Sequence, residues 1–282
     1  MHDAAPEGRL TVIGSGTLLP SSARSSPAYH VEVSGGPESD APGARIVSVL
    51  LDCGSGTLHA LARHGIEWES IDTLAISHYH ADHVGDLVAL LGAWRFQGRE
   101  RPLTLLGPSD IDGFLERLAS VYGGWVLEPG FPIRIVALGP SGSWSDEQGV
   151  LRIDGSPTPH TETSVSFRVA GAWGTLGYTG DTSPSDTLAR FLVGCDVLVA
   201  ECALTDPPEF DGHLTPLSLG ELCSTARPGL LLVTHVYPPT SPETMVELVR
   251  DQWGGNVEAA HDGMSVLITR RHVNVDRPAR GE

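Results

Sequence analysis

Short apolar runs alternate along the chain with helical patterns and with turns rich in glycine and serine. In the first half, runs of Leu, Val and Ile have the length of buried strands, and apolar residues at helical spacing occupy the segments between them. The helical segment that starts at Thr57 runs into Gly65, a residue type that commonly ends helices. The pattern predicts strands over 10–13, 28–33, 46–52, 71–77 and 103–106, and helices over 57–64, 86–96 and 111–121.

The pattern resumes after a stretch rich in glycine and serine, 139–149, which we interpret as the joint between two halves. The second half, about 150–270, alternates strands with helices as the first half, about 1–138, does, and residues 271–282 are expected to form a flexible tail. Two such blocks predict two packed sheets in a layered α/β sandwich. The predicted strands are 151–153, 165–169, 175–178, 197–200, 230–234 and 265–269, and the predicted helices are 183–192, 217–225 and 242–251.

The composition is that of a globular protein with a strongly acidic surface. Among 282 residues, 35 acidic side chains against 18 basic ones give a formal net charge of −17, and every basic residue is arginine. Such a surface repels polyanions and anionic membranes. No apolar run reaches the ~18 residues that span a bilayer, and the N-terminus lacks an apolar signal core. We therefore expect a cytoplasmic protein whose four cysteines, which form no C-x-x-C pair, are reduced.

A cluster of metal-ligating side chains follows one of the predicted buried strands. The sequence HYHADH at 78–83 places three imidazoles and a carboxylate within six residues. Burying these groups without partners is costly, and imidazole with carboxylate is a ligand set for divalent cations. In a turn, His78 and His80 can face one side while Asp82 and His83 face another. The spacing therefore suits two adjacent metal positions rather than one.

This segment resembles the H-x-H-x-D-H signature of the metallo-β-lactamase-fold hydrolases, and the rest of the chain matches that family in order and spacing. His160 matches the family's third histidine, Asp181 its bridging aspartate and His235 its last histidine. The resemblance implies a four-layer αββα sandwich of two mixed β-sheets flanked by helices, formed as one domain by residues 1–282. It also implies two divalent metal ions, zinc or manganese. It assigns His78, His80 and His160 to one metal, Asp82, His83 and His235 to the other, and a bridging role to Asp181.

Further motifs narrow the resemblance within the family. The sequences GSG at 14–16, GDT at 180–182 and HLT at 213–215 are similar to those of ribonuclease Z and its shorter relatives, which include small cyclic-phosphate phosphodiesterases. That group carries a histidine in an H-x-T context that protonates the leaving oxygen or holds the phosphate, and His213 fits this position. Two carboxylates could support the site. Asp52 could orient a ligand histidine or simply cap a turn, and Glu201 could orient His213 or be structural.

One feature separates the chain from tRNA-processing members of that group, which usually insert a long arm to grip the tRNA. His160 and Asp181 are only 21 positions apart, which leaves no room for an arm between them. Together with the net charge, this argues against binding a whole tRNA. Arg95, Arg99 and Arg101 could form a small anion-binding rim, but a solvated helix end is the simpler interpretation.

We weigh three enzymatic hypotheses and one non-enzymatic hypothesis. One of the enzymatic hypotheses, an iron-dependent redox reaction, uses one metal, and the complete ligand set for two metals, which includes Asp82 and His235, argues against it. The leading hypothesis is a dinuclear metal-dependent hydrolase that cleaves a phosphodiester, in a small molecule or short nucleotide, by a metal-bridged hydroxide. Asp82 would accept or steer the proton of the attacking water, and His213 would protonate the leaving oxygen. The alternative is hydrolysis of a lactone, carboxylic ester or β-lactam, because one fold and metal site host many substrates. The non-enzymatic hypothesis is a metal-binding scaffold that has lost turnover. Because relatives often form dimers, we also expect that the protein can form a homodimer.

Overall fold

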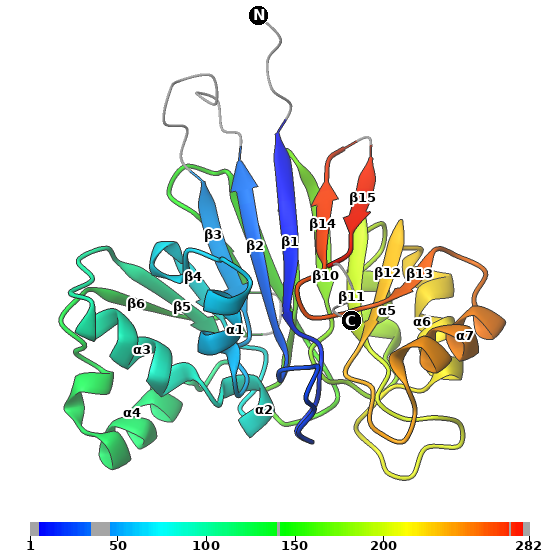
Figure 1. Cartoon of the computed structure of the whole chain (residues 1–282), viewed down its shortest axis with the longest axis horizontal. Coiled ribbons are helices and arrows are strands. Elements are labelled where there is room, and N and C mark those ends of the chain that lie inside the picture. The colour runs from blue at the N-terminus through cyan, green and yellow to red at the C-terminus, as the bar shows by residue number, and fades with distance from the viewer. Residues whose placement is uncertain (1–5, 35–45, 140–141, 271, 279–282) are drawn as a thin grey trace, which may run out of the picture.

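The computed structural model describes residues 6–34, 46–139, 142–270 and 272–278, which form two β-sheets packed face to face with helices on both outer sides (Figure 1). The first sheet is antiparallel from β15 to β3 and parallel from β3 to β6. In spatial order its strands are β15 (Val273–Asp276), β14 (Ser265–Ile268), β1 (Glu7–Gly14), β2 (Ala28–Ser34), β3 (Val47–Leu51), β4 (Thr73–Ala75), β5 (Leu103–Gly107) and β6 (Ile133–Ala137).

The second sheet has the same division into a parallel and an antiparallel part. Strands β13 to β10 are parallel and β10 to β7 antiparallel. In spatial order its strands are β13 (Val257–Ala259), β12 (Leu230–Thr234), β11 (Val197–Glu201), β10 (Gly174–Tyr178), β9 (Val165–Gly171), β8 (Leu151–Pro157) and β7 (Ser143–Ser145).

Helices cover the outer face of each sheet. Those of the first sheet are α1 (Thr57–Arg63), α2 (Ala81–Val84), α3 (Leu87–Phe96) and α4 (Ile111–Tyr122), with short 3₁₀ turns η1 (Trp68–Ser70) and η2 (Gly124–Val126). Those of the second sheet are α5 (Asp186–Phe191), α6 (Pro216–Ala226) and α7 (Pro242–Gln252). Among the described residues, no helix is both long and apolar enough to cross a membrane.

Three apolar clusters hold these layers together. The first lies between the two sheets and includes Leu10 of β1 and Phe167 of β9. The second joins the first sheet to its helices through residues such as Trp94, and the third joins the second sheet to its helices through residues such as Val249. Burying apolar surface on both sides of each sheet is the main stabilising contribution to such a fold. The predicted four-layer αββα sandwich is thus confirmed.

The structure departs from the sequence predictions in the C-terminal tail, in the predicted joint at 139–149 and in the division of the chain into two halves. The tail predicted to be flexible contains β15, which pairs with β14, so that prediction is wrong for 273–276, whereas 271 and 279–282 lie outside the described residues. The predicted joint contains the strand β7, whose residues are exposed, buried and exposed in turn. This strand pairs with β8. The two halves of the chain also do not correspond to the two sheets, because β14, from the second half, pairs with β1 in the first sheet.

The ends of the parallel strands bring polar residues to one edge of the sandwich. In the first sheet, Asp52 follows β3 and His78 lies three residues after β4. In the second sheet, Asp181 follows β10, Glu201 ends β11 and His235 follows β12. Crevices outside the carboxyl ends of parallel strands are the usual binding position in α/β sheets. This is the lower edge in Figure 1, where α2 lies.

Candidate metal centre

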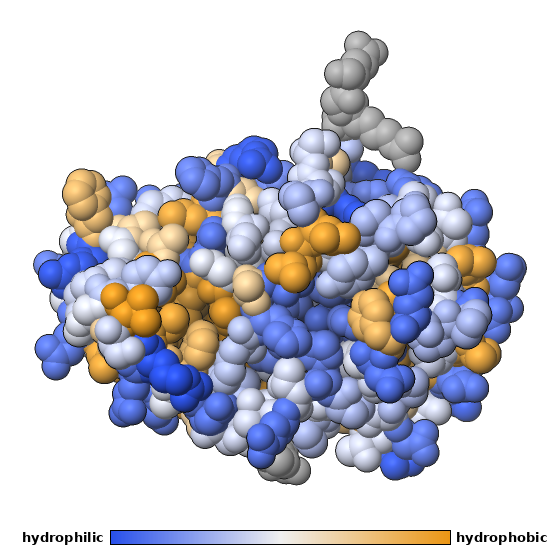
Figure 2. Space-filling view, turned by 90° about the horizontal axis from the view of Figure 1, so that it is seen from below, coloured by the Kyte–Doolittle hydropathy of each residue, from blue (hydrophilic) through white to orange (hydrophobic). Residues whose placement is uncertain are grey.

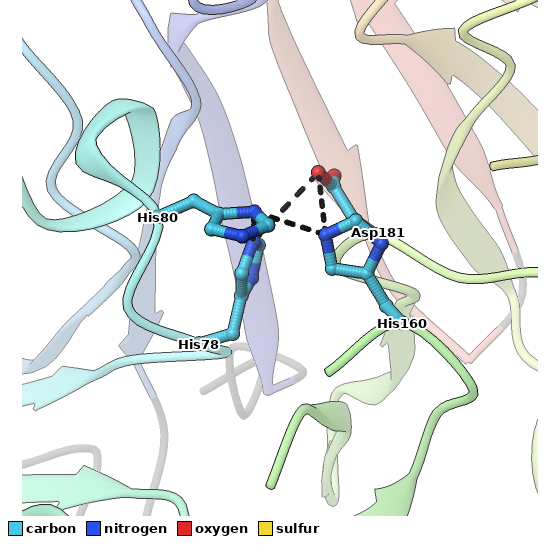
Figure 3. Close-up of side chains that lie close together, drawn as sticks. All are labelled: His78, His80, His160 and Asp181. Carbon is cyan, nitrogen blue, oxygen red and sulfur yellow. Dashed lines mark hydrogen bonds and ion pairs between the residues drawn. The ribbon is translucent and has the colours of Figure 1, made fainter. Parts of the chain in front are cut away.

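Four of the predicted ligands converge on one point between the two sheets (Figure 3). His78 and His80 reach it from the segment after β4, and His160 and Asp181 from the segments after β8 and β10. The Nδ1 atom of His80 lies 3.1 Å from Nε2 of His78 and 3.0 Å from Nε2 of His160. The Oδ2 atom of Asp181 lies 3.7 and 3.6 Å from the Nε2 atoms of His78 and His160. Ligand atoms around a tetrahedral zinc are about 3.3 Å apart, so these spacings fit one cation.

The remaining three predicted ligands form a second group beside the first. The Nε2 atom of His235 lies 3.2 Å from Oδ2 of Asp82, and the Nε2 atom of His83 lies 3.9 Å from the same oxygen. Asp181 also faces this group, but through its other oxygen: Oδ1 lies 3.3 Å from Nε2 of His83 and 3.7 Å from Nε2 of His235. One carboxylate therefore presents one oxygen to each group. This is the geometry of a bridging ligand.

The atoms at the centre of the second group fit a cation. Nε2 of His83 and Oδ1 of Asp181 are buried, and within the described residues neither has a hydrogen-bond partner of acceptable geometry. Buried polar atoms without partners are unfavourable, so each is explained most simply as a metal ligand. Burial alone would lower the pKa of His83, but the carboxylates of Asp181 and Asp52 outweigh it and raise the pKa well above its ordinary value. The position thus attracts positive charge.

Asp52 fixes two of these histidines. It is fully buried, at a positive φ of 57°, and accepts hydrogen bonds from the backbone N–H of Ser77 at 2.7 Å and from the hydroxyl of Tyr178 at 2.5 Å. Nδ1–H of His83 donates to it at 2.7 Å. The Ser77 hydroxyl also donates to Asp52, so Nδ1–H of His78 donates to that hydroxyl at 3.0 Å. Both imidazoles therefore direct Nε2 toward the site, and a carboxylate beside a metal-binding histidine commonly orients the ring in this way.

The third ligand histidine of the first group is fixed by a loop. Nδ1–H of His160 donates to the carbonyl oxygen of Gly212 at 2.8 Å, which again leaves Nε2 free to bind a cation. Gly212 has a positive φ of 106°, and a Cβ atom there would lie 3.3 Å from the His160 ring. This glycine therefore allows the close approach of the loop to the ligand.

The protonation states of His78 and Asp181 suit cation binding, whereas His83 would have to release a proton to bind a cation. Burial lowers the pKa of His78 well below its ordinary value, and the charge of the neighbouring His83 lowers it further. His78 is therefore neutral at pH 7. Burial alone would raise the pKa of Asp181, but the charges of His235 and His83 outweigh it and hold the pKa well below its ordinary range. Neutral imidazoles and ionised carboxylates are the forms that bind metals.

His213 lies against two of the histidines predicted to be metal ligands. Its ring stacks on that of His235, with centroids 5.6 Å apart and planes 19° from parallel, and lies 5.0 Å from that of His160. Nδ1 of His213 contacts Oε1 of the buried Glu201 at 3.0 Å. Burial alone would lower the pKa of His213, but its hydrogen bond to Glu201 and the charge of that carboxylate raise it above its ordinary value.

Backbone hydrogen bonds hold Glu201 and His213 in place. Glu201 accepts three backbone N–H bonds, from Thr182 at 2.8 Å, Ala203 at 3.2 Å and Leu214 at 3.3 Å. Thr215 then caps α6 in a reciprocal pair with Ser218, which fixes the chain two residues after His213. The carboxylate and the histidine are therefore held by the backbone on both sides.

The three arginines do not reach this site. Arg99 donates to the carbonyl oxygen of Ile71 at 2.8 Å, at the opposite end of β4 from His78, and its guanidinium lies 5.1 Å over the ring of Trp94. Arg101 pairs with Asp72 close to it, and Arg95 donates to the carbonyl oxygen of Glu128 at 3.4 Å. These contacts hold Arg99 and Arg101 at the end of β4 away from His78, so they do not line the metal centre.

The edge that carries the site is open to solvent on one side. His80 is exposed and His160 and His213 are half-buried, whereas the ligands of the second group are buried. Seen from this edge, much of the middle of the molecule is hydrophilic, with one hydrophobic patch above its centre, and larger hydrophobic patches lie on the side where α3 and α4 pack (Figure 2). Sequence reasoning missed Ser77, Tyr178, Phe210 and Tyr237 as neighbours of the site; of these, Tyr237 could have been found from its place two residues after His235.

Comparisons with known proteins agree with this geometry. Residues 48–236 match the family described as "Beta-lactamase superfamily domain". An uncharacterized protein of Mycobacterium tuberculosis is 32% identical over 276 residues, covering 92% of this chain and 91% of the relative. A ribonuclease Z of Mycobacterium bovis is 24% identical over 280 residues, covering 90% of this chain and 95% of the relative.

A solved structure supports the fold. The metallo-β-lactamase fold protein YhfI from Bacillus subtilis superposes with a TM-score of 0.75 at 24% identity, covering 93% of this chain and 99% of that one. Membership in one family explains three features together: the two mixed sheets, the helical outer layers, and the groups of histidine and aspartate residues between the sheets. The chain therefore belongs to the β-lactamase superfamily and is a hydrolase of the metallo-β-lactamase fold.

Proposed function

We propose that this chain hydrolyses small phosphodiesters with the help of two divalent cations. The observation that carries the proposal is the division of Asp181 between two ligand groups, Oδ2 toward the first and Oδ1 toward the second. Histidine-rich ligand groups favour zinc, with manganese as the alternative. Two cations at such a site neutralise charge on phosphoryl oxygens and make water a nucleophile at neutral pH.

The chain's own residues divide the proton transfers between them. Burial alone would raise the pKa of Asp82, but its hydrogen bond from His235 and the charge of His83 lower it, so Asp82 is an ionised carboxylate able to accept or steer a proton. His213 carries the opposite role. Its raised pKa increases the fraction protonated at neutral pH, and it lies where a leaving oxygen beside the ligands could receive that proton. Glu201 acts through His213 as a positioning residue.

Two features favour a phosphodiester of modest size over a whole tRNA. The relatives include proteins named ribonuclease Z, which supports phosphodiester chemistry. The 21 positions from His160 to Asp181 hold the hairpin of β9 and β10, so no arm lies there. The net charge of −17 opposes the many phosphate contacts on which polynucleotide affinity depends.

Substrate comparison tests this proposal. The purified protein with zinc or manganese should hydrolyse bis-p-nitrophenyl phosphate readily and cleave a precursor tRNA poorly at physiological salt. A lactone panel run beside it covers the carbon-ester alternative. Tight, salt-resistant tRNA processing, or a lactone preferred to every phosphodiester, would contradict the proposal.

A leaving-group series tests the role of His213. His213→Ala should slow hydrolysis of phosphodiesters with poor leaving groups by roughly 10²-fold, because a general acid contributes about this much, and should change p-nitrophenyl esters little. His59→Ala, which removes an exposed histidine of α1, is the matched control and should behave as the unsubstituted protein does. An equal loss on both ester classes would show that His213 is not the acid.

A further inference from the structure

An exposed aromatic side chain stands beside the proposed acid. Phe210 is 48% exposed, within a segment from 205 to 211 whose residues are all exposed. Its ring centroid lies 5.7 Å from that of His213, and the planes are nearly perpendicular at 82°. Single exposed apolar side chains are common on protein surfaces, and Phe96 is exposed further, so the feature that distinguishes Phe210 is its contact with His213.

A second aromatic ring borders the same histidine. Tyr237 is half-buried, and its ring lies 5.5 Å from that of His235 and 6.1 Å from that of His213, at 76° and 67° to their planes. Phe210 and Tyr237 come from separate segments, one before His213 and one after β12. We call these two side chains the aromatic rim.

Both segments of the rim are anchored by the backbone. The N–H of Gly212 donates to the Ser183 hydroxyl at 3.1 Å, and the N–H of Tyr237 donates to the carbonyl oxygen of Ala203 at 3.2 Å. The carbonyl oxygen of Gly212 in turn holds His160. These bonds limit the freedom of the backbone beside each ring, which reduces the cost of ordering the rings when a ligand stacks on them.

The negative charge of the segment around Phe210 affects which ligands the aromatic rim can bind. Asp206, Glu209 and Asp211 are exposed around Phe210. These carboxylates repel the backbone phosphates of a polynucleotide, whereas an uncharged base is not repelled. Aromatic side chains bind bases of every sequence because each base has a π face. The segment therefore suits the base end of a small nucleotide and opposes a polyanion running along it.

We propose that Phe210 and Tyr237 bind the nucleobase of a nucleotide phosphodiester whose phosphate lies at the metal centre beside His213. This inference rests on the proposed phosphodiester hydrolysis and deepens it by naming the substrate class. Stacking of one base on an aromatic side chain corresponds to roughly a 5- to 150-fold difference in affinity. The rim should therefore determine KM rather than the chemical step.

Two esters with the same leaving group test the inference. Thymidine 5′-(p-nitrophenyl phosphate) carries a base, and methyl p-nitrophenyl phosphate does not; both release p-nitrophenolate, which needs no proton from His213. The unsubstituted protein should show a KM at least roughly 10-fold lower for the thymidine ester. Phe210→Ala and Tyr237→Leu should each reduce this KM ratio, and Phe210→Trp, which keeps a ring, should retain it.

A matched control separates the rim from aromatic side chains in general. Phe96, at the end of α3, is 92% exposed and lies on the helical layer of the first sheet, so Phe96→Ala should leave the KM ratio unchanged. A ratio near one in the unsubstituted protein, or one that survives both Phe210→Ala and Tyr237→Leu, would overturn the inference alone. Hydrolysis of neither ester by the metal-loaded protein would overturn the proposed function, and this inference with it.

Discussion

The two ligand groups share one carboxylate but differ in burial and in how they are held. In the first, His80 is exposed and His160 half-buried; in the second, Asp82, His83 and His235 are all buried. We call them the open group and the buried group. A cation held by the buried group would be less accessible to solvent than one held by the open group. The difference predicts a tightly bound cation in one and a more exchangeable cation in the other.

The largest expected effect comes from the residue that the two groups share. Within the part of the chain that the structure describes, Asp181 is the one carboxylate grouped with His78, His80 and His160. Asp181→Ala removes it and leaves the cations without the negative charge between them, so both should be lost. Hydrolysis should fall by at least roughly 10³-fold, more than for one charge-stabilising donor. Elemental analysis of the purified variant measures this. Two full equivalents of metal would show that Asp181 does not bridge, and Asp211→Ala, an exposed aspartate nearby, should keep both.

A smaller effect should separate the groups. His80→Ala removes a ligand of the open group alone, so the metal content should fall from about two to about one per chain while activity is lost. Because His80 is exposed, the thermal unfolding temperature should change little apart from the loss of bound metal. Activity equal to that of the unsubstituted protein would contradict the assignment of His80.

The hold on the buried group can be weakened without removing a ligand. Asp52→Asn keeps the size of the side chain but removes the charge that receives Nδ1–H of His83 at 2.7 Å. Loss of such a partner typically lowers metal affinity 10–100-fold. Competition with a metal-binding dye would measure this affinity, and Tyr178→Phe, which removes one neutral donor to Asp52, should have a smaller effect. An unchanged affinity in Asp52→Asn would mean that the buried group does not depend on this carboxylate.

The outer parts of the fold show what sequence patterns leave out. The strands that sequence reasoning missed, β6, β7, β13 and β15, are the edge strands of the two sheets. An edge strand pairs on one side only and is less buried, so its apolar pattern is weak: β15 alternates between half-buried and exposed residues. Interior strands such as β12, fully buried, were predicted with their observed bounds.

The HYHADH segment was recognisable because its chemistry is concentrated, whereas His160, Asp181 and His235 were assigned from the family resemblance. The HYHADH segment needs only one turn, from β4 to α2, to divide its ligands between two groups. By contrast, the contact of Tyr178 with Asp52 joins residues 126 positions apart, and the approach of Phe210 to His213 depends on a loop conformation. Such contacts arise from packing between sheets and loops, which no local pattern encodes.

The smallest expected effect is kinetic. When a chelator is added to the metal-loaded protein, one equivalent should leave quickly, from the open group, and the second slowly, from the buried group. Metal remaining on the protein after timed desalting would show two phases, and Asp52→Asn should accelerate the slow phase. A single phase for both equivalents would mean that burial does not distinguish the groups.

The central claim is that Asp181 holds two cations, one in each group. The most direct measurement is the anomalous scattering of crystals of the zinc-loaded protein, recorded on both sides of the zinc absorption edge. We expect two peaks about 3.5–4 Å apart, one beside each oxygen of Asp181. A single peak, or two peaks of which one does not contact Asp181, would contradict it.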